Sequence, residues 1–392
     1  MAVVVVISNV AGSRSAVASQ LARTPKAPIA TSVAATPPAR VAPGTGIIRW
    51  GSSYKSASGY NRFQYVFVVR DDARSAAGLR GKSLVYASGT SIKTTWSTGV
   101  TYSEAAANGW LLTDQNGQPI TTHEGSAYIA DIGNPAYQRQ FVENMKGFLS
   151  RNRNQGIFID DVIAVSHGLI SENVLPAKYP TDQAWEDAMV SFVGYVGPAL
   201  KKLGYYVVVN AHKFIPGNQA SNDGTLEAGF WKRLAPSVSG LMSEYWLQSP
   251  IDVAQLRQRG SRWDQNWTGW QGLESVAQGA GVDFFGLMYG SASDVRAMRY
   301  GRGTFLLDWD GRGGAFVYNM TDRSDPYDPS WMTDLGPALR PKFQRLPGVW
   351  QRRFERGIAI VNTTGSPVTV RVRGTLQTIA ATDALFSANP PT

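Results

Sequence analysis

The chain has 392 residues, of which 43% are hydrophobic, 17% charged and 11% aromatic, with 40 Gly and 21 Pro. This length suits one large domain with an appendage, and the Gly and Pro content indicates many connections between elements, which excludes a helical bundle, a coiled coil or a wholly disordered chain. The chain has no Cys and a net charge of +9 without a basic run. These features exclude disulfides, thiolate metal sites and a cysteine nucleophile, and we expect no nucleic-acid partner.

Residues 1–46 are predicted to form an N-terminal strand followed by an extended arm. The apolar stretch 1–7 has no preceding Lys or Arg, which favours a β-strand over a signal peptide. Residues 11–46 consist largely of Ala, Ser, Thr and Pro, a composition that cannot bury enough apolar surface to fold alone. No apolar stretch approaches the ~20 residues of a membrane-spanning helix, so we expect no membrane insertion.

Residues 47–344 are predicted to form a (β/α)8 barrel, an α/β fold. Short β-rich runs alternate with helical stretches in this segment. The predicted strands are 64–69, 83–87, 127–132, 157–161, 205–210, 241–246, 284–289 and 304–309. The predicted helices are 135–151, 182–203, 225–234, 270–278 and 292–300. This number of units in a segment of this length favours a TIM barrel over an open doubly wound sheet.

Residues 345–392 are predicted to form a small antiparallel β domain packed against the barrel. The segments 357–362, 367–372 and 378–386 are rich in β-formers, turn residues separate them, and no helical pattern lies between them.

Polar residues close the predicted barrel strands, at the end where such barrels carry their chemistry. They are Asp131, Asp160, Asp161, Asn210, Glu244 and Asp308. An ionised group at a strand end destabilises the fold unless it is solvated, paired with an opposite charge or required for the function of a site. Capping of the following helix is an equal alternative for Asp131. Because strands alternate with period two, only one of Asp160 and Asp161 is expected to face the barrel axis, and we favour Asp160.

The stretch Gly156-Ile-Phe-Ile-Asp160-Asp161-Val162 resembles the strand-four motif of glycoside-hydrolase-like (β/α)8 barrels related to α-amylases and α-galactosidases. Segments 110–114, 129–137 and 353–357 are similar to the order of motifs in those families. The resemblance implies hydrolysis of a glycosidic bond by two carboxylates, a nucleophile or base and a proton donor with a raised pKa. Asp160 matches the strand-four carboxylate of the family, and we choose Glu244 as the acid. Asp131, Asp161, Asn210 and Asp308 are then candidates for binding sugar hydroxyls or orienting the pair.

Aromatic residues gather after the sixth predicted strand, where ring stacking on sugar faces and plain loop packing are equal alternatives. They are Tyr245, Trp246, Trp263, Trp267 and Trp270, of which we select Trp246 as a substrate-binding candidate, together with Tyr289 and His212 elsewhere. The three histidines lack the spacing of a zinc site. We therefore predict neither a metal nor an organic cofactor.

The first functional hypothesis is a glycoside hydrolase that acts on a bacterial surface or cell-wall polysaccharide. The alternative is a non-catalytic structural protein that binds a glycan on the same barrel. The chain combines an apolar first strand, a Pro-rich arm and a fold expected to act on an extracellular polysaccharide, without an export signal. This arrangement resembles that of minor tail proteins of bacteriophages infecting actinobacteria. We therefore expect a virion or extracellular location, with neighbouring virion subunits or further copies of the chain bound through residues 1–46.

Overall fold

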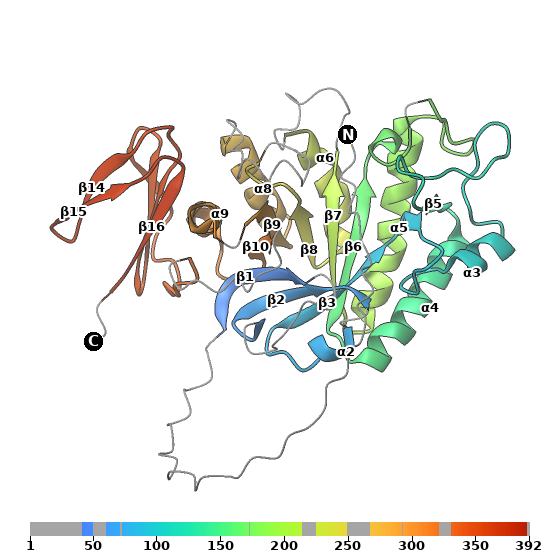
Figure 1. Ribbon diagram of the computed structural model, residues 1–392, viewed down its shortest axis with the longest axis horizontal. Coiled ribbons are helices and arrows are strands. Elements are labelled where there is room, and N and C mark those ends of the chain that lie inside the picture. Colours follow the sequence, from blue (N-terminus) through green and yellow to red (C-terminus); the bar gives the residue numbers. More distant parts are fainter. Residues whose placement is uncertain are drawn as a thin grey trace, which may run out of the picture.

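A computed structural model describes residues 41–49, 60–70, 73–171, 173–213, 225–248, 267–291, 293–320 and 331–389. Its centre is a closed barrel of eight parallel strands, and smaller antiparallel sheets follow at the C-terminus (Figure 1). This architecture confirms the predicted (β/α)8 barrel with a C-terminal antiparallel β domain. The predicted first strand, 1–7, and the arm up to residue 40 lie outside the described residues.

The barrel strands follow one another in chain order around the ring. They are β1 (Ala42–Arg49), β2 (Phe63–Val68), β3 (Lys82–Ser88), β6 (Gly156–Ile163), β7 (Tyr206–His212), β8 (Gly240–Ser243), β9 (Asp283–Gly290) and β10 (Ala315–Met320), and β10 pairs with β1 to close the ring. All predicted strands except 127–132 and 304–309 coincide with strands of this barrel. Their continuous apolar runs are explained by burial on both faces, as is usual for parallel strands.

Helices cover the outside of the barrel. The longer ones are α4 (Pro135–Asn152), α5 (Asp182–Lys202), α6 (Thr225–Leu234), α8 (Trp267–Gly279) and α9 (Val295–Asp308), with the short α2 (Ala73–Ala76) and α3 (Tyr102–Ala107) between them. Asn134 caps α4 by accepting a hydrogen bond from the amide of Ala136, and Thr181 caps α5 in the same way from Ala184. In the described part of the chain, none of the helices has the length and hydropathy that crossing a membrane requires.

The predicted strand 304–309 is wrong, because these residues form the last turns of α9. This helix contacts β9 and β10 of the barrel and also β13 and β16 of the C-terminal domain. Burial from both directions leaves Phe305, Leu306 and Leu307 with at most 2% exposure, so the run shows no polar side and resembles a buried strand. The eighth barrel strand is instead β10.

Two further strand predictions need correction. Of the segment 127–132, only β5 (Tyr128–Ile129) is a strand, and it pairs antiparallel with β4 (Ser91–Ile92) outside the barrel. The first barrel strand, β1, starts at Ala42, within the segment predicted as the arm. Its Pro and Gly residues are typical of a coil, but pairing with β2 and β10 and hydrogen bonds from Arg302 to the carbonyls of Pro43 and Gly44 hold it in place.

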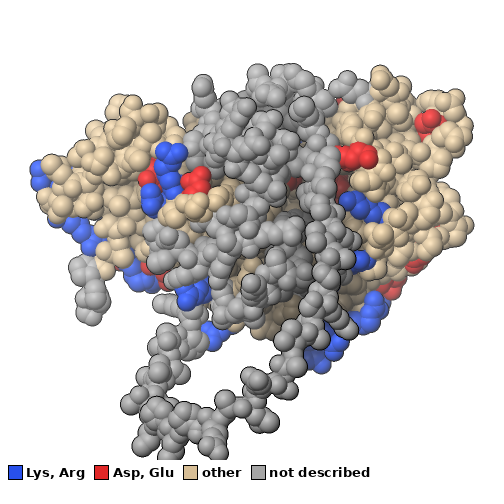
Figure 2. Space-filling model, in the orientation of Figure 1, with Lys and Arg blue, Asp and Glu red and all other residues tan. Residues whose placement is uncertain are grey.

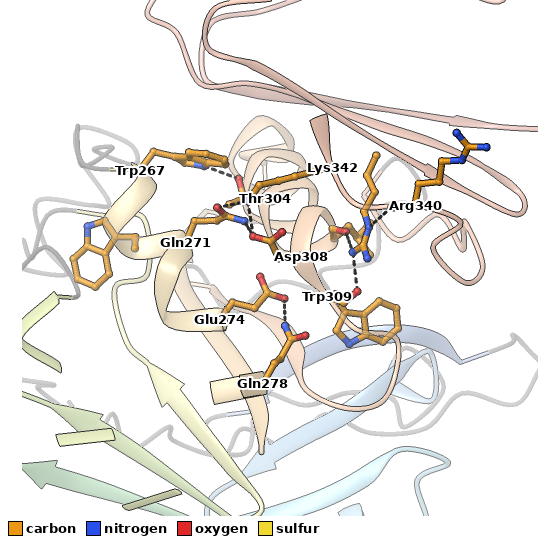
Figure 3. A network of polar contacts seen from close by, with 12 residues as sticks. Trp267, Gln271, Glu274, Gln278, Thr304, Asp308, Trp309, Arg340 and Lys342 are labelled. Atoms are coloured by element: carbon orange, nitrogen blue, oxygen red, sulfur yellow. Dashed lines mark hydrogen bonds and ion pairs between the residues drawn. The ribbon is translucent and has the colours of Figure 1, made fainter. Parts of the chain in front are cut away.

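The C-terminal domain packs on the α8–α9 side of the barrel (Figure 1). It comprises a sheet of β11 (Phe343–Leu346), β12 (Val349–Phe354), β13 (Gly357–Asn362) and β16 (Asp383–Ala388), and a hairpin of β14 (Val368–Val372) and β15 (Thr375–Ile379). Lys342 Nζ lies 2.5 Å from Asp308 Oδ2 and 2.6 Å from Gln271 Oε1, in a polar network between the two parts of the chain (Figure 3). These contacts hold the domain against the barrel.

Candidate active site

The candidate site is the last layer of side chains inside the barrel, at the carboxyl ends of its strands. Phe158, Val208 and Met242 point inward and belong to the apolar core of the barrel. Every second residue of a strand faces the same side, so the next inward position on each of these chain segments lies two residues later. These next positions are polar. The resulting polar layer consists of Tyr86, Asp160, Asn210, Glu244 and Tyr289, contributed by β3, β6, β7, the end of β8 and β9.

Asn210 joins the two carboxylates that the sequence selects as the catalytic pair. Its Nδ2 donates to Asp160 Oδ1 at 2.8 Å and to Glu244 Oε2 at 2.7 Å. The two oxygens lie at these distances from one nitrogen, so they cannot be more than 5.5 Å apart. The hydroxyl of Tyr289 donates to Glu244 Oε1. The structure therefore brings four of the predicted site residues together in one layer.

Asp161 lies beside this layer on an irregular stretch of β6. The register with β7 shifts between Ile159 and Val162, and Asp161 has a left-handed backbone with φ of 60°. Its Oδ2 accepts hydrogen bonds from Ser88 and Ser91, each at 2.9 Å. The simple alternation expected for Asp160 and Asp161 fails here, because a bulge interrupts the period of two. The charge of Asp161 consequently acts on Asp160.

His212 forms a bridge between two carboxylates. Its Nε2 lies 3.7 Å from Glu244 Oε2, and its Nδ1 lies 3.3 Å from Glu227 Oε1. Burial opposes a charged imidazole, but Glu227 and Glu244 outweigh it and raise the pKa of His212 to about 10. His212 is therefore a cation near neutral pH, and it stands beside one member of the carboxylate pair.

The two carboxylates of the pair have pKa values shifted in opposite directions. Burial, together with the negative charges of Asp161 and Glu244, raises the pKa of Asp160 to about 7. Burial also disfavours ionised Glu244, but His212, Tyr289 and Asn210 stabilise its charge and lower its pKa below the ordinary range. Near neutral pH, Glu244 is ionised while a large fraction of Asp160 keeps its proton.

This charge distribution favours the opposite division of roles from the one we inferred from the sequence. A proton donor needs a raised pKa, which belongs to Asp160, and a nucleophile or base must be ionised, which describes Glu244. The strand positions of the pair are as predicted. The hydrogen-bond partners that set the charges are not readable from strand-end residues alone.

Trp246 does not belong to the polar layer. Its side chain is 0% exposed, its Nε1 donates to the carbonyl of Trp270 at 2.8 Å, and its ring covers Gly286 so closely that a Cβ there would lie 2.3 Å from the indole. The backbone of Tyr245 and Leu247 is left-handed on either side of it, which turns the chain away from the axis after Glu244. Trp246 is therefore core, not a sugar-stacking platform.

The other aromatic residues that follow the sixth predicted strand do not all lie in the same environment. Trp267 and Trp270 are buried on α8, and Trp263 lies outside the described residues. Tyr245 stacks on Tyr289 with ring centroids 4.9 Å apart, so it borders the polar layer. Plain packing thus explains the two indoles of α8, whereas Tyr245 stacks at the border of the polar layer.

Asp308 and Asp131 lie apart from the pair. Asp308 ends α9 and contacts Gln271 and Lys342 in the network that holds the C-terminal domain (Figure 3). Its predicted place at a strand end is wrong for the same reason as strand 304–309. Asp131 precedes α4, and its carboxylate accepts hydrogen bonds from Lys178 and Tyr179. These contacts of Asp131 involve neither Asp160 nor Glu244.

The sequence reasoning missed Glu227, Tyr86 and the two serines that bind Asp161. Glu227 is 8% exposed and stands in the first turn of α6, where an acidic residue has the ordinary meaning of a favourable interaction with the helix dipole. Tyr86 is an inward residue of a correctly predicted strand, so counting by twos from Leu84 would have found it. Ser88 and Ser91 carried no signal, because their role depends on the bulge in β6.

The comparisons with known proteins concern the fold. The chain shares its barrel fold with glycoside hydrolases. A β-L-arabinopyranosidase from Geobacillus stearothermophilus superposes with a TM-score of 0.51 at 11% identity, over 89% of this chain and 96% of that one. An α-amylase from Geobacillus thermoleovorans gives 0.47 at 7% identity, over 90% and 100%. Ega3 from Aspergillus fumigatus, in complex with galactosamine, gives 0.37 at 11% identity, over 64% and 78%. No protein-family model and no curated protein sequence matches the chain.

Among the described residues, no group of three or more His, Asp and Glu side chains is arranged to hold a metal ion. The polar layer itself combines a carboxyl group with a raised pKa, that of Asp160, and a carboxylate with a lowered pKa, that of Glu244.

Glu227 is predicted to control the charge of His212. In Glu227→Gln the imidazole loses one of its two carboxylate partners, so the pKa of His212 should fall from about 10 toward its ordinary value of 6.5. The chain has three His, so NMR titration of the imidazole signals resolves the change. Glu186→Gln is the matched control, because Glu186 is equally buried but pairs with Lys213 and Arg233. An unchanged His212 titration in Glu227→Gln contradicts this account.

Proposed function

We propose that the protein is a glycoside hydrolase in which Asp160 is the proton donor and Glu244 the nucleophile. The observation that carries the proposal is the pairing of two carboxyl groups through Asn210, with a raised pKa on one and a lowered pKa on the other. Two carboxyl groups with separated pKa values are what hydrolysis of a glycosidic bond requires.

The proposed reaction proceeds in two displacements. Asp160 gives its proton to the glycosidic oxygen, the bond between that oxygen and the anomeric carbon breaks, and Glu244 forms a covalent ester with the anomeric carbon. Asp160, now ionised, takes a proton from water, whose oxygen attacks the anomeric carbon and releases Glu244. Both starting protonation states are thereby restored, and one water is consumed.

The spacing of the pair supports retention of the anomeric configuration. Retaining enzymes hold their carboxyl groups roughly 5–5.5 Å apart, whereas inverting enzymes need about 6.5–9.5 Å to admit a water molecule between sugar and base. The Asn210 bridge limits the nearest oxygens of the pair to 5.5 Å. This close approach of two carboxyl oxygens is compatible with the double-displacement reaction proposed above.

The remaining residues of the layer have supporting roles in this proposal. Tyr289 and His212 keep Glu244 ionised and fix its orientation. Burial and the negative charge of Asp161 favour the protonated form of Asp160 in the free protein. The same negative charge favours the positively charged, oxocarbenium-like transition state once Asp160 has released its proton.

The substrate class and the location are proposed from the sequence. We propose a bacterial surface or cell-wall polysaccharide as the substrate, and a virion or extracellular location in which residues 1–46 bind neighbouring virion subunits or further copies of the chain. Mass spectrometry of purified phage particles tests the virion location. Peptides of this chain in proportion to tail proteins support it, and particles without the chain contradict it.

Activity of single-residue variants tests the pair. Asp160→Asn and Glu244→Gln should each lower the rate of reducing-end release from a cleaved glycan by roughly 10²-fold or more, since each removes one of the two reacting groups. A glycan panel of purified bacterial cell-wall and capsular polysaccharides identifies the substrate. Asp160→Asn should keep more of its activity on an aryl glycoside with a good leaving group, because that bond needs no proton donor, while Glu244→Gln should lose activity on both.

Two control variants separate this prediction from a general effect of removing a carboxylate. Asp308→Asn makes the same change on α9, and Glu143→Gln makes it on the exposed face of α4, so both should retain wild-type rates. Equal release by the wild type and both pair variants would reject the site. Binding of glycans by a wild-type protein that cleaves none of them would favour the non-catalytic glycan-binding protein.

A further inference from the structure

The C-terminal domain carries an open groove of about 500 Å³ between its sheet and its hairpin. β11, β12 and β14 contribute to its lining, and none of the residues of the polar layer takes part. Four arginines line it, Arg345, Arg353, Arg371 and Arg373. We refer to this feature as the arginine groove.

The arginine groove has positive charges without matching negative ones. No Asp or Glu is among its lining residues, and among the described residues none of its four guanidinium groups forms an ion pair with a carboxylate. Their hydrogen bonds go to neutral acceptors: Arg345 donates to Gln351 and to the carbonyl of Arg371, and Arg373 donates to Asn389. Side chains of Lys and Arg also lie along the outer edge of this domain (Figure 2).

Local structure explains how three of the four arginines reach the groove. In β14, Val368, Val370 and Val372 face the small core of the domain, so Arg371 between them must face outward. Arg373 follows in the turn of the hairpin with a left-handed backbone at φ of 50°. Arg345 on β11 contacts the backbone of β14 and thereby joins the two sheets. The cluster is thus built by the fold of the domain.

The groove also has apolar surface. Phe343 is 46% exposed and Leu339 59% exposed, and both line it beside the arginines. Exposed apolar side chains next to unpaired cations suit a ligand that has apolar C–H faces and anionic groups on the same chain. Guanidinium groups bind carboxylate or phosphate through two parallel hydrogen bonds.

We propose that the arginine groove binds a polysaccharide that carries anionic groups, carboxylate or phosphate, at a distance from the barrel site. The choice of a polysaccharide over another polyanion rests on the proposed glycosidase function of the barrel. Single-stranded nucleic acid fits less well, since its binding surfaces use several exposed aromatic rings for base stacking, and of the two rings that line the groove only that of Phe343 is exposed. The groove would hold a polymeric substrate while the barrel acts on another part of it.

Binding to defined polymers tests the proposal. The full chain carrying Asp160→Asn is titrated calorimetrically with polygalacturonate as the carboxylate probe, poly(glycerol phosphate) as the phosphate probe, and fully methyl-esterified polygalacturonate as the uncharged match. We expect binding to at least one charged polymer, weakening as salt is added, and no binding to the methyl ester. Adding Arg353→Glu and Arg371→Glu should weaken the affinity about tenfold or more, since hydrogen-bonded charge pairs are lost and repulsion is added.

A matched double variant controls for the change of net charge. Arg139→Glu and Arg151→Glu alter two exposed arginines of α4, on the far side of the barrel from the C-terminal domain, and should leave the affinity unchanged (Figure 1). Thermal unfolding of both double variants verifies that they fold. Equal affinity for charged and methyl-esterified polymer, or an unchanged affinity in the groove variant, overturns the proposal. Tighter binding of single-stranded DNA than of either polymer overturns the choice of a polysaccharide.

These outcomes are distinguishable from a failure of the proposed hydrolysis. Binding is measured in a variant that lacks the proposed proton donor, so it does not depend on cleavage. A protein that cleaves no glycan but loses polymer affinity in the groove variant has the arginine groove without the hydrolase. A protein that cleaves a glycan with unchanged polymer affinity has the hydrolase without the groove.

Discussion

The site depends on the alternation of side chains in parallel strands that close into a ring. Each strand places every second residue inside the barrel, and at five neighbouring strand ends the inward row changes from apolar to polar. Two carboxylates, an amide and two phenols are thereby forced into one layer above an apolar core. Hydrogen bonds between these side chains join members of the layer. The Asn210 amide, 2% exposed, does so by donating to both carboxylates at once.

From this confinement follows the uneven distribution of charge. The negative charges of Asp160, Asp161 and Glu244 repel one another within one small region. The cations and hydrogen-bond donors around these three carboxylates are not distributed equally. His212, itself held by Glu227, stands on the side of Glu244, so the proton is retained on Asp160. The same arrangement explains why residues outside the pair matter: Glu227 acts on the charge of His212, and two serines hydrogen-bond the carboxylate of Asp161, which in turn acts on Asp160.

The sequence predicted the structure correctly where local pattern alone determines the element or the direction of a side chain. Strands with continuous apolar runs, capped helices and the polar ends of β6, β7, β8 and β9 could be read from local pattern, and with them Asp160, Asn210 and Glu244. It failed where tertiary contacts override the pattern. The apolar end of α9 resembles a strand because the C-terminal domain covers its outer side, and β1 resembles a coil because its support comes from Arg302 on a distant helix. From the sequence alone, Trp246 resembles a residue that stacks on a sugar ring. The left-handed backbone at Tyr245, which turns the chain after Glu244, cannot be read from that pattern. The proposed acid and nucleophile roles depend on the contact between His212 and Glu227, which strand-end residues do not reveal.

The protonation order of Asp160 and Glu244 is the most direct test of this account. Carboxyl carbons of Asp and Glu are labelled with 13C, titrated by NMR in the full chain, and assigned through the loss of one signal in each pair variant. The account predicts that Asp160 titrates near pH 7, with coupling to Asp161, and that Glu244 titrates below the ordinary range of a glutamate. Ordinary titration of both groups, or a Glu244 that keeps its proton to higher pH than Asp160, would contradict it.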